Sequence, residues 1–212
     1  LAEHEAVRSG AGLFDISHMG RFRVSGADAL AFLQHTLTND ASALTPGLAQ
    51  YTIIPDEAGS AVDDAYLYQR GDDDYLLVVN ASNTGKDYGR LSRHLERYPK
   101  AELKDITADL FMASLQGPQS PAILEALLPD PAKSAFRSLL EAKRNSFISV
   151  AFEGRSLILS RTGYTGEPHS FELFTPAELA VGLWEKLLSA GGPLGISPVG
   201  LGARDSLRLE AA

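Results

Sequence analysis

The stretch Ala61-Val62-Asp63-Asp64-Ala65-Tyr66-Leu67-Tyr68 places two adjacent aspartates inside an otherwise apolar run. Such a run is typical of a β-strand, in which successive side chains point to opposite faces of the sheet. One of the two carboxylates can therefore be solvated, whereas the other faces whatever packs on the sheet. A charge there is costly unless it is paired or used. An edge strand or a turn that leaves both carboxylates in water is the simpler alternative.

The chain around this run predicts the order strand, helix, three strands, helix. Strands are expected at 21–24, 50–54, 61–68 and 75–79, and helices at 27–37 and 83–97. Short turn sequences at 56–59 and 71–74 predict hairpins, and hence an antiparallel sheet. The helix at 83–97 has a basic outer face, which we expect to be solvated.

A similar order recurs in the second half of the chain. Strands are expected at 111–115, 147–152, 156–161 and 171–174, and helices at 120–128 and 176–190. Only the order of elements repeats, without a residue-level repeat. The sequence therefore predicts an α+β fold of two lobes, each a mainly antiparallel sheet with helices.

Composition narrows the class of protein. The 212 residues are 44% hydrophobic and 22% charged, which is ordinary for a globular chain. The net charge of −8 gives no general attraction for nucleic acid or anionic membrane, and we expect neither as a partner. Cysteine is absent, which excludes thiolate metal sites and a cysteine nucleophile within this chain. The five histidines show no metal-ligand spacing, so no metal is expected.

Two stretches of the chain carry residues that a simple loop does not require. Asn80 ends a predicted strand and offers a donor and an acceptor at once, which suits the amide edge of a heterocycle. Ser82 or Asn83 is explained as the N-cap of the next helix. Further on, Gly163 and Gly166 bracket a tyrosine and a threonine, so the backbone must bend sharply there or approach something closely.

Charged residues near the C-terminal end form a second group of candidates. Glu172 lies between two apolar residues of a predicted strand and so projects to the opposite face, which is either exposed or functional. The run Gly200-Leu201-Gly202-Ala203-Arg204-Asp205 suits a guanidinium placed at a tight helix start. Its Gly-x-Gly pattern alone is weak support for phosphate binding.

Taken together and in order, these segments resemble the aminomethyltransferase (glycine cleavage system T-protein) family, which depends on folate. The resemblance spans nearly all of the chain. It rests on Gly12-Leu13-Phe14-Asp15-Ile16-Ser17-His18-Met19-Gly20, Thr38-Asn39-Asp40, Val62-Asp63-Asp64, Val78-Val79-Asn80-Ala81-Ser82-Asn83, Leu115-Gln116-Gly117-Pro118, Arg161-Thr162-Gly163-Tyr164-Thr165-Gly166-Glu167 and Gly200-Leu201-Gly202-Ala203-Arg204-Asp205-Ser206-Leu207-Arg208-Leu209-Glu210.

The resemblance implies a three-domain cloverleaf with tetrahydrofolate in its central hole. This chain looks like the first two domains, interleaved. Residues 1–20 and 107–212 would form the first folate-binding lobe, and residues 21–106 the second lobe with the aspartate pair. A few residues before Leu1 and a C-terminal barrel domain after Ala212 are expected in a complete member of the family.

The resemblance also implies a reaction. A one-carbon unit moves from an aminomethyl-lipoyl carrier protein (H-protein-like) to tetrahydrofolate, and ammonia is released. Tetrahydrofolate is then a co-substrate, the lipoylated carrier is the protein partner, and the expected location is the cytoplasm, or the mitochondrial matrix in a eukaryote.

Site residues follow from the resemblance, position by position. Asp64 matches the family's critical aspartate, and we expect it to be the buried carboxylate that stabilises developing positive charge or handles a proton. Glu172 would bind the guanidine-like edge of the pterin, and Arg204 would lie near the folate and its glutamate tail. The remaining matches to the pterin cavity are Met19, Tyr51, Asn80 and Tyr164.

One departure from the family pattern leaves alternatives open. The loop Gly166-Glu167-Pro168-His169-Ser170-Phe171-Glu172 is one residue longer than the usual Gly-Glu-Asp-Gly-(Phe/Tyr)-Glu. Glu172 reaches the pterin only if the extra residue bulges outward. A related folate-dependent demethylase of a small methylated amine or sulfonium is therefore an alternative. A non-catalytic folate-binding iron–sulfur assembly factor is another, although its cysteine motif has no counterpart in this chain.

Overall fold

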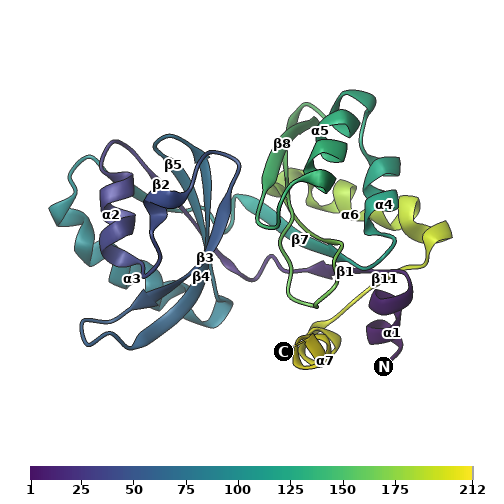
Figure 1. Cartoon of the computed structure of the whole chain (residues 1–212), viewed down its shortest axis with the longest axis horizontal. Coiled ribbons are helices and arrows are strands. Elements are labelled where there is room, and N and C mark those ends of the chain that lie inside the picture. Colours follow the sequence, from purple (N-terminus) through teal and green to yellow (C-terminus); the bar gives the residue numbers. More distant parts are fainter. Residues whose placement is uncertain (212) are drawn as a thin grey trace. The chain divides into compact units, whose positions relative to one another are not determined.

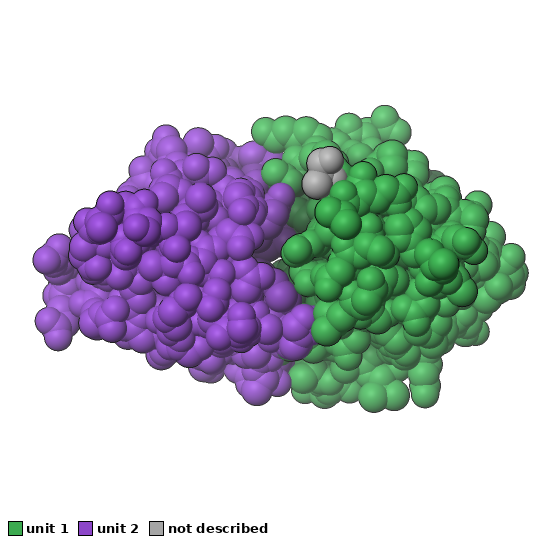
Figure 2. All heavy atoms as spheres, turned by 90° about the horizontal axis from the view of Figure 1, so that it is seen from below, with its two compact units in different colours: residues 1–17, 110–212 green, residues 18–109 purple. Residues whose placement is uncertain are grey.

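The computed structural model describes residues 1–211 and separates into two compact units. Unit 1 joins Leu1–Ser17 with Leu110–Ala212, and unit 2 is the continuous segment His18–Asp109 (Figure 2). The chain therefore passes from unit 1 to unit 2 after residue 17 and returns to unit 1 after residue 109. The expected boundaries were after residues 20 and 106.

Unit 2 is a five-stranded antiparallel sheet covered on one face by two helices (Figure 1). The strand order is β3-β4-β5-β2-β6. The elements are β2 (Gly20–Ser25), α2 (Ala29–Thr36), η1 (Ala41–Ala43), β3 (Ala49–Pro55), β4 (Ala61–Gly71), β5 (Asp74–Val79), η2 (Ala81–Asn83), α3 (Thr84–His94), η3 (Leu95–Arg97) and β6 (Glu102–Asp105).

Strand β4 lies inside this sheet, between β3 and β5, so the edge-strand alternative is wrong. Its side chains alternate as predicted. Asp63 is buried on the face that carries Ala65 and Leu67 of the core, whereas Asp64 is exposed. Fully burying a residue such as Leu67 contributes about 1.5–3 kcal/mol, which fixes the register and therefore decides which aspartate faces the helices.

Unit 1 is built on a six-stranded sheet of order β11-β1-β7-β10-β9-β8, antiparallel except for the parallel pair β1–β11. Helices α4, α5 and α6 contribute to its hydrophobic core. The elements are α1 (Ala2–Ser9), β1 (Ala11–Asp15), β7 (Leu110–Gln116), α4 (Ser120–Leu127), α5 (Asp130–Glu141), β8 (Phe147–Phe152), β9 (Arg155–Ser160), β10 (Ser170–Pro176), η4 (Ala177–Leu179), α6 (Ala180–Gly191), η5 (Gly192–Leu194), β11 (Ile196–Pro198) and α7 (Leu201–Ala211).

The predicted α+β class with two mainly antiparallel sheets is confirmed. Helices α1 and α5 and strands β1, β6 and β11 were not predicted from the sequence. Helix α5 was missed because Pro129 and Pro131 suggest a loop, yet a proline is tolerated in the first turn of a helix. Its buried residues, Ala132, Phe136 and Leu139, follow helical spacing. No helix within residues 1–211 has the length and apolar character needed to cross a membrane.

Candidate functional site

The aspartate pair of β4 is tied to the end of the neighbouring strand by one asparagine. Asn80 follows β5, and its side-chain Nδ2 donates to Asp63 Oδ1 at 2.9 Å and to Asp64 Oδ1 at 2.7 Å. The backbone N–H of Asn80 also donates to Asp63 Oδ2 at 3.0 Å. Asn80 therefore joins the buried carboxylate to the exposed one.

The exposed member of the pair is Asp64, so the expectation that Asp64 is the buried carboxylate is wrong. Asp64 pairs with Ile53 of β3, so the two side chains lie on the same face of the sheet. Tyr51, two residues before Ile53, lies on that face as well. Tyr51 is 49% exposed. Burial first, and then the charge of Asp64 and hydrogen bonding to it, raise the pKa of Tyr51 above its ordinary value. This face of unit 2 thus presents a carboxylate, an amide and a phenol together.

Asp63 is only 8% exposed and is the most heavily hydrogen-bonded acid of this cluster. Besides the two hydrogen bonds from Asn80, its Oδ1 accepts a hydrogen bond from Asn83 Nδ2 at 2.7 Å. Burial by itself would raise the pKa of Asp63, but hydrogen bonds from Asn80, Asp87 and Asn83 outweigh that effect and hold the pKa below its ordinary value. Asp63 is therefore ionised at neutral pH.

Asn83 stands at the N-cap position of α3, yet its side chain makes no capping hydrogen bond. The predicted N-cap position of Asn83 is confirmed, but the side chain does not cap the helix, and its Nδ2 donates to Asp63 Oδ1 instead. Met19, another predicted site residue, is half-buried just before β2 in unit 2, and its carbonyl accepts a hydrogen bond from the Arg21 guanidinium.

In unit 1, Glu172 lies in β10 and is 8% exposed, so the reading of an exposed face is wrong. The hydroxyl of Thr162 donates to Glu172 Oε2. In the sheet register Glu172 stands between Ser114 of β7 and Ser160 of β9. A buried carboxylate is thus placed among hydroxyl side chains on the interior of a sheet, where it can act as an acceptor for a cationic or guanidine-like group.

Tyr164 and Arg204 are stacked in the same unit. The guanidinium carbon of Arg204 lies 4.7 Å from the centre of the Tyr164 ring, and Phe14 contacts that ring edge-on at 5.5 Å. Burial, and then the charge of Glu172, raise the pKa of Tyr164 well above its ordinary value. Within residues 1–211, the buried Tyr164 hydroxyl and Arg204 Nε have no well-formed hydrogen bond. Unsatisfied buried polar atoms of this kind fit a ligand with its own donors and acceptors.

The two glycines around Tyr164 serve different purposes. A Cβ on Gly163 would clash with Ser170, so this position needs close backbone approach, whereas Gly166 has φ +82° and needs the left-handed region. The longer loop that follows keeps Pro168 and His169 exposed, and β10 starts directly after them at Ser170. The extra length is accommodated at the surface, and Glu172 keeps its place in the strand.

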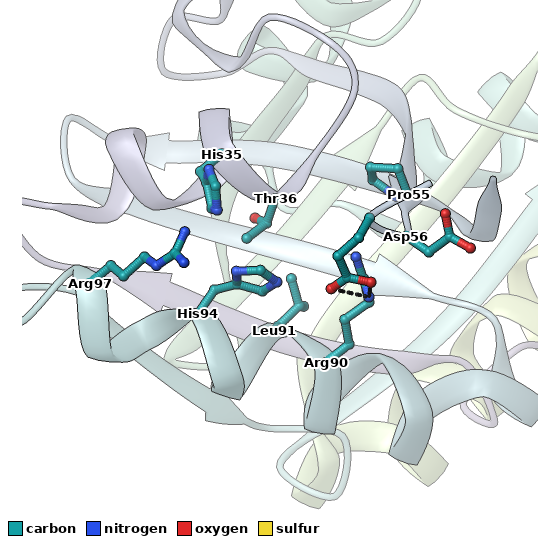
Figure 3. Close-up of a pocket in the computed structure, with 9 residues that line it drawn as sticks. His35, Thr36, Pro55, Asp56, Arg90, Leu91, His94 and Arg97 are labelled. Carbon is teal, nitrogen blue, oxygen red and sulfur yellow. Dashed lines mark hydrogen bonds and ion pairs between the residues drawn. The ribbon is translucent and has the colours of Figure 1, made fainter. Parts of the chain in front are cut away.

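A separate cavity of about 360 Å³ lies in unit 2 between α2, α3 and the end of β3 (Figure 3). Its lining includes His35, Arg90, His94 and Arg97 but none of the predicted site residues. The side chain of Arg90 is only 12% exposed and pairs with Glu57 at 3.2 Å, so the expectation of a fully solvated basic face on this helix is wrong at Arg90. No group of His, Asp and Glu side chains within residues 1–211 is arranged to hold a metal ion.

Sequence reasoning missed three residues of these clusters: Asp87, Thr162 and Gln116. Gln116 accepts hydrogen bonds from Thr165 and Ser170 and so braces the loop around Tyr164. Asp87 had a signal that could have found it. It lies four residues before buried Leu91 on α3, and a charged residue at a core-facing helical position calls for a reason.

Comparisons with known proteins agree over the whole chain. The family model described as the GCVT N-terminal domain matches residues 1–212. Aminomethyltransferases of Geobacillus kaustophilus and Bacillus mycoides are 49% and 46% identical over 209 residues, covering 99% of this chain and 55% of each relative. The crystal structure of glycine cleavage system aminomethyltransferase T from Bartonella henselae is 35% identical, with a TM-score of 0.85, covering 100% of this chain and 54% of that one. The chain therefore spans about half the length of these relatives.

Proposed function

The chain belongs to the GCVT N-terminal domain family, and we propose that it works as the folate-binding and catalytic part of a tetrahydrofolate-dependent aminomethyltransferase. In this reaction both heteroatom bonds of an aminomethyl group carried on a lipoyl sulfur break. The C–N bond releases ammonia, the C–S bond leaves the dihydrolipoyl thiol on the carrier, and the carbon forms two bonds to the amine nitrogens of tetrahydrofolate as a methylene group. The supporting observation is the identity of 46% to 49% to relatives named aminomethyltransferase, over 99% of this chain.

The unit 1 residues fit a reduced pterin. Glu172 supplies a carboxylate, which matches a guanidine-like edge in geometry and charge. The hydroxyl of Tyr164 and Nε of Arg204 are buried polar atoms without a well-formed hydrogen bond to any other described residue. We propose these three side chains as the tetrahydrofolate contacts of unit 1, and Asn80, Tyr51 and Met19 as the tetrahydrofolate contacts of unit 2. When bound, tetrahydrofolate supplies the amine nitrogens that accept the one-carbon unit.

Asp64 is the residue we propose for the chemistry. Its carboxylate is exposed on unit 2 and is oriented by the Asn80 amide at 2.7 Å. A fixed negative charge stabilises positive charge that develops as a C–N bond breaks, and a carboxylate can also hold the proton that the departing nitrogen requires. Holding two large reactants together contributes further, since it replaces a bimolecular encounter.

The protein partner we propose is a lipoylated carrier protein. A long lipoyl arm delivers the aminomethyl group to a site on another protein, so this chemistry requires a docked carrier. A small methylated amine or sulfonium as donor would need no carrier, and this difference separates the two related reactions.

The test uses the natural protein that contains this chain. Tetrahydrofolate is titrated by calorimetry, and ammonia release is then measured with aminomethylated carrier protein. We expect saturable binding and ammonia release that requires both reactants. Binding without ammonia release, but with turnover of a small methylated amine, would instead support the demethylase. No binding of tetrahydrofolate would overturn the proposal altogether.

A further inference from the structure

Asp87 is a fully buried acid that the proposed chemistry does not use. It lies on α3 with 0% of its surface exposed. Within residues 1–211, no N–H or O–H donor makes a hydrogen bond to either of its carboxyl oxygens. The charged groups whose fields reach it are Asp63 on β4 and Lys86 on its own helix, and the Lys86 ammonium donates to the Val62 carbonyl at 2.9 Å. An ionised Asp87 would therefore be a buried charge that no N–H or O–H donor among the described residues stabilises, with only the field of Lys86 in its favour.

The carboxyl group of Asp87 meets the carboxylate of Asp63, and the contact is a hydrogen bond only if one of the two carries a proton. Asp63 already accepts three N–H groups from Asn80 and Asn83, which favour its ionised form. The proton therefore belongs to Asp87. Burial and the neighbouring Asp63 raise the pKa of Asp87 to about 7, in agreement with this assignment.

The same contacts continue to Asp64. Asn80 Nδ2 has two hydrogens and uses them on Asp63 and Asp64 at 2.9 and 2.7 Å. The amide can be oriented in two ways, and the charge on Asp63 selects the one that turns the NH₂ group toward the carboxylates. A second negative charge at Asp87 would repel Asp63, and loss of the donor would leave one side of Asp63 unsupported.

We propose that Asp87 is a positioning residue for Asp64: its carboxyl proton holds Asp63, Asp63 orients the Asn80 amide, and Asn80 fixes the Asp64 carboxylate. This inference rests on the proposed role of Asp64 in the reaction. Asp87 itself lies behind the strand, on the helix-covered face, and acts only through the two intervening side chains.

The first test compares two substitutions in the natural protein. Asp87→Asn keeps a donor toward Asp63 that does not titrate, whereas Asp87→Leu removes the donor. We expect Asp87→Leu to lower kcat at least about tenfold with KM for tetrahydrofolate changed less than about threefold. Asp87→Asn should retain most of kcat at pH 6.5 and lose less activity than the parent protein as the pH rises through 8.

The control variant is Asp72→Asn, an exposed aspartate in the β4–β5 turn, which should leave kcat and its pH profile unchanged. An Asp87→Leu protein with the parental kcat, or an Asp87→Asn protein with the parental alkaline limb, would overturn the proposal. If Asp87→Leu fails to fold, the Asp87→Asn profile decides the outcome alone.

The second test needs no turnover, so it separates this proposal from the proposed function. The side-chain NH₂ resonances of Asn80 are followed by ¹⁵N NMR as the pH is raised from 5 to 9. We expect them to shift with a midpoint near the pKa of Asp87, about 7, and to stay constant in the Asp87→Asn protein. A shift that persists in Asp87→Asn, or is absent from the parent protein, would overturn the positioning role even if the protein proves to be an active transferase.

Discussion

Asp63 in unit 2 and Glu172 in unit 1 are equally buried carboxylates, each 8% exposed on an inner strand of a sheet, but their surroundings differ. Glu172 receives a hydroxyl donor from Thr162 and lies beside serines of both neighbouring strands. Asp63 receives amide donors and faces a second carboxyl group, Asp87.

The difference teaches how a protein keeps a buried charge. The Thr162 hydroxyl that donates to Glu172 does not titrate near neutral pH, so this hydrogen bond is independent of pH there. The hydrogen bonds to Asp63 include one from the carboxyl proton of Asp87, and this proton is lost when Asp87 ionises. We therefore expect the Asp63 cluster of unit 2 to respond to pH near neutrality, whereas the surroundings of Glu172 in unit 1 should not.

The largest effect is expected for Asp64→Asn. The amide keeps the shape of the side chain but removes the negative charge, so turnover should fall at least about 1000-fold, or about 4 kcal/mol in activation free energy. The dissociation constant of tetrahydrofolate should change less than about threefold. Single-turnover ammonia release and calorimetry measure the two quantities. Unchanged turnover would remove Asp64 from the chemistry.

The second prediction concerns stability and pH at Asp87. The folded protein keeps Asp87 protonated up to about pH 7, whereas an unfolded chain loses the proton near the ordinary aspartate pKa of 3.8. The folded state thus binds more protons between these values, and the free energy of unfolding falls as the pH rises through them. The lowered pKa of Asp63 acts in the opposite sense, but only below the ordinary aspartate range.

Asp87→Asn removes this dependence. Between pH 5 and pH 8 the parent protein should lose about 2–3 kcal/mol more unfolding free energy than Asp87→Asn does. Urea denaturation at half-unit pH steps measures the difference. Parallel stability curves for the two proteins would mean that Asp87 does not hold a proton in the folded state.

The third prediction concerns Glu172→Gln, which keeps the side-chain shape and replaces the charged acceptor by an amide. Tetrahydrofolate binding should weaken by about 1–3 kcal/mol, the range for a lost charged hydrogen bond. Glu178→Gln, at an exposed position of unit 1, is the matched control and should bind normally. Equal affinities in both variants would show that Glu172 does not contact the ligand.

The smallest effect is expected for Arg204→Lys. A lysine keeps the charge but loses the planar stacking on Tyr164, which is worth about 0.5–1 kcal/mol at a partly exposed site. Backbone amides of α7 should exchange a few times faster with deuterium. Arg208→Lys, exposed on the same helix, should leave exchange unchanged. Equal protection of both variants would assign no stabilisation to the stacked pair.

Strand alternation was the most informative part of the sequence. It predicted that Asp63 and Asp64 lie on opposite faces, because a side-chain period of two is a property of the backbone alone. The alternation could not say which face is buried. That choice depends on where α2 and α3 pack, and it placed Asp63 inside and Asp64 outside, against our expectation.

The resemblance identified candidate site residues but not the residues that form hydrogen bonds to them. Asn80 was expected to bind ligand, and in the structure its NH₂ group is occupied by the two aspartates. Asp87 and Thr162 were not predicted as site residues, because their roles lie in contacts with Asp63 of β4 and Glu172 of β10. Local patterns carry no information about such contacts.

By itself, the sequence determined the class of fold, the alternating faces of β4 and the family to which the chain is similar, since each follows from local periodicity or from residues in order. Only the tertiary structure decided which carboxylate of the aspartate pair is buried and that Glu172 lies in β10 despite the longer loop. It also decided that Asp87 on α3 lies against Asp63 on β4. The physical reason is that burial and proton sharing are properties of neighbours in space, and folding alone brings those neighbours together.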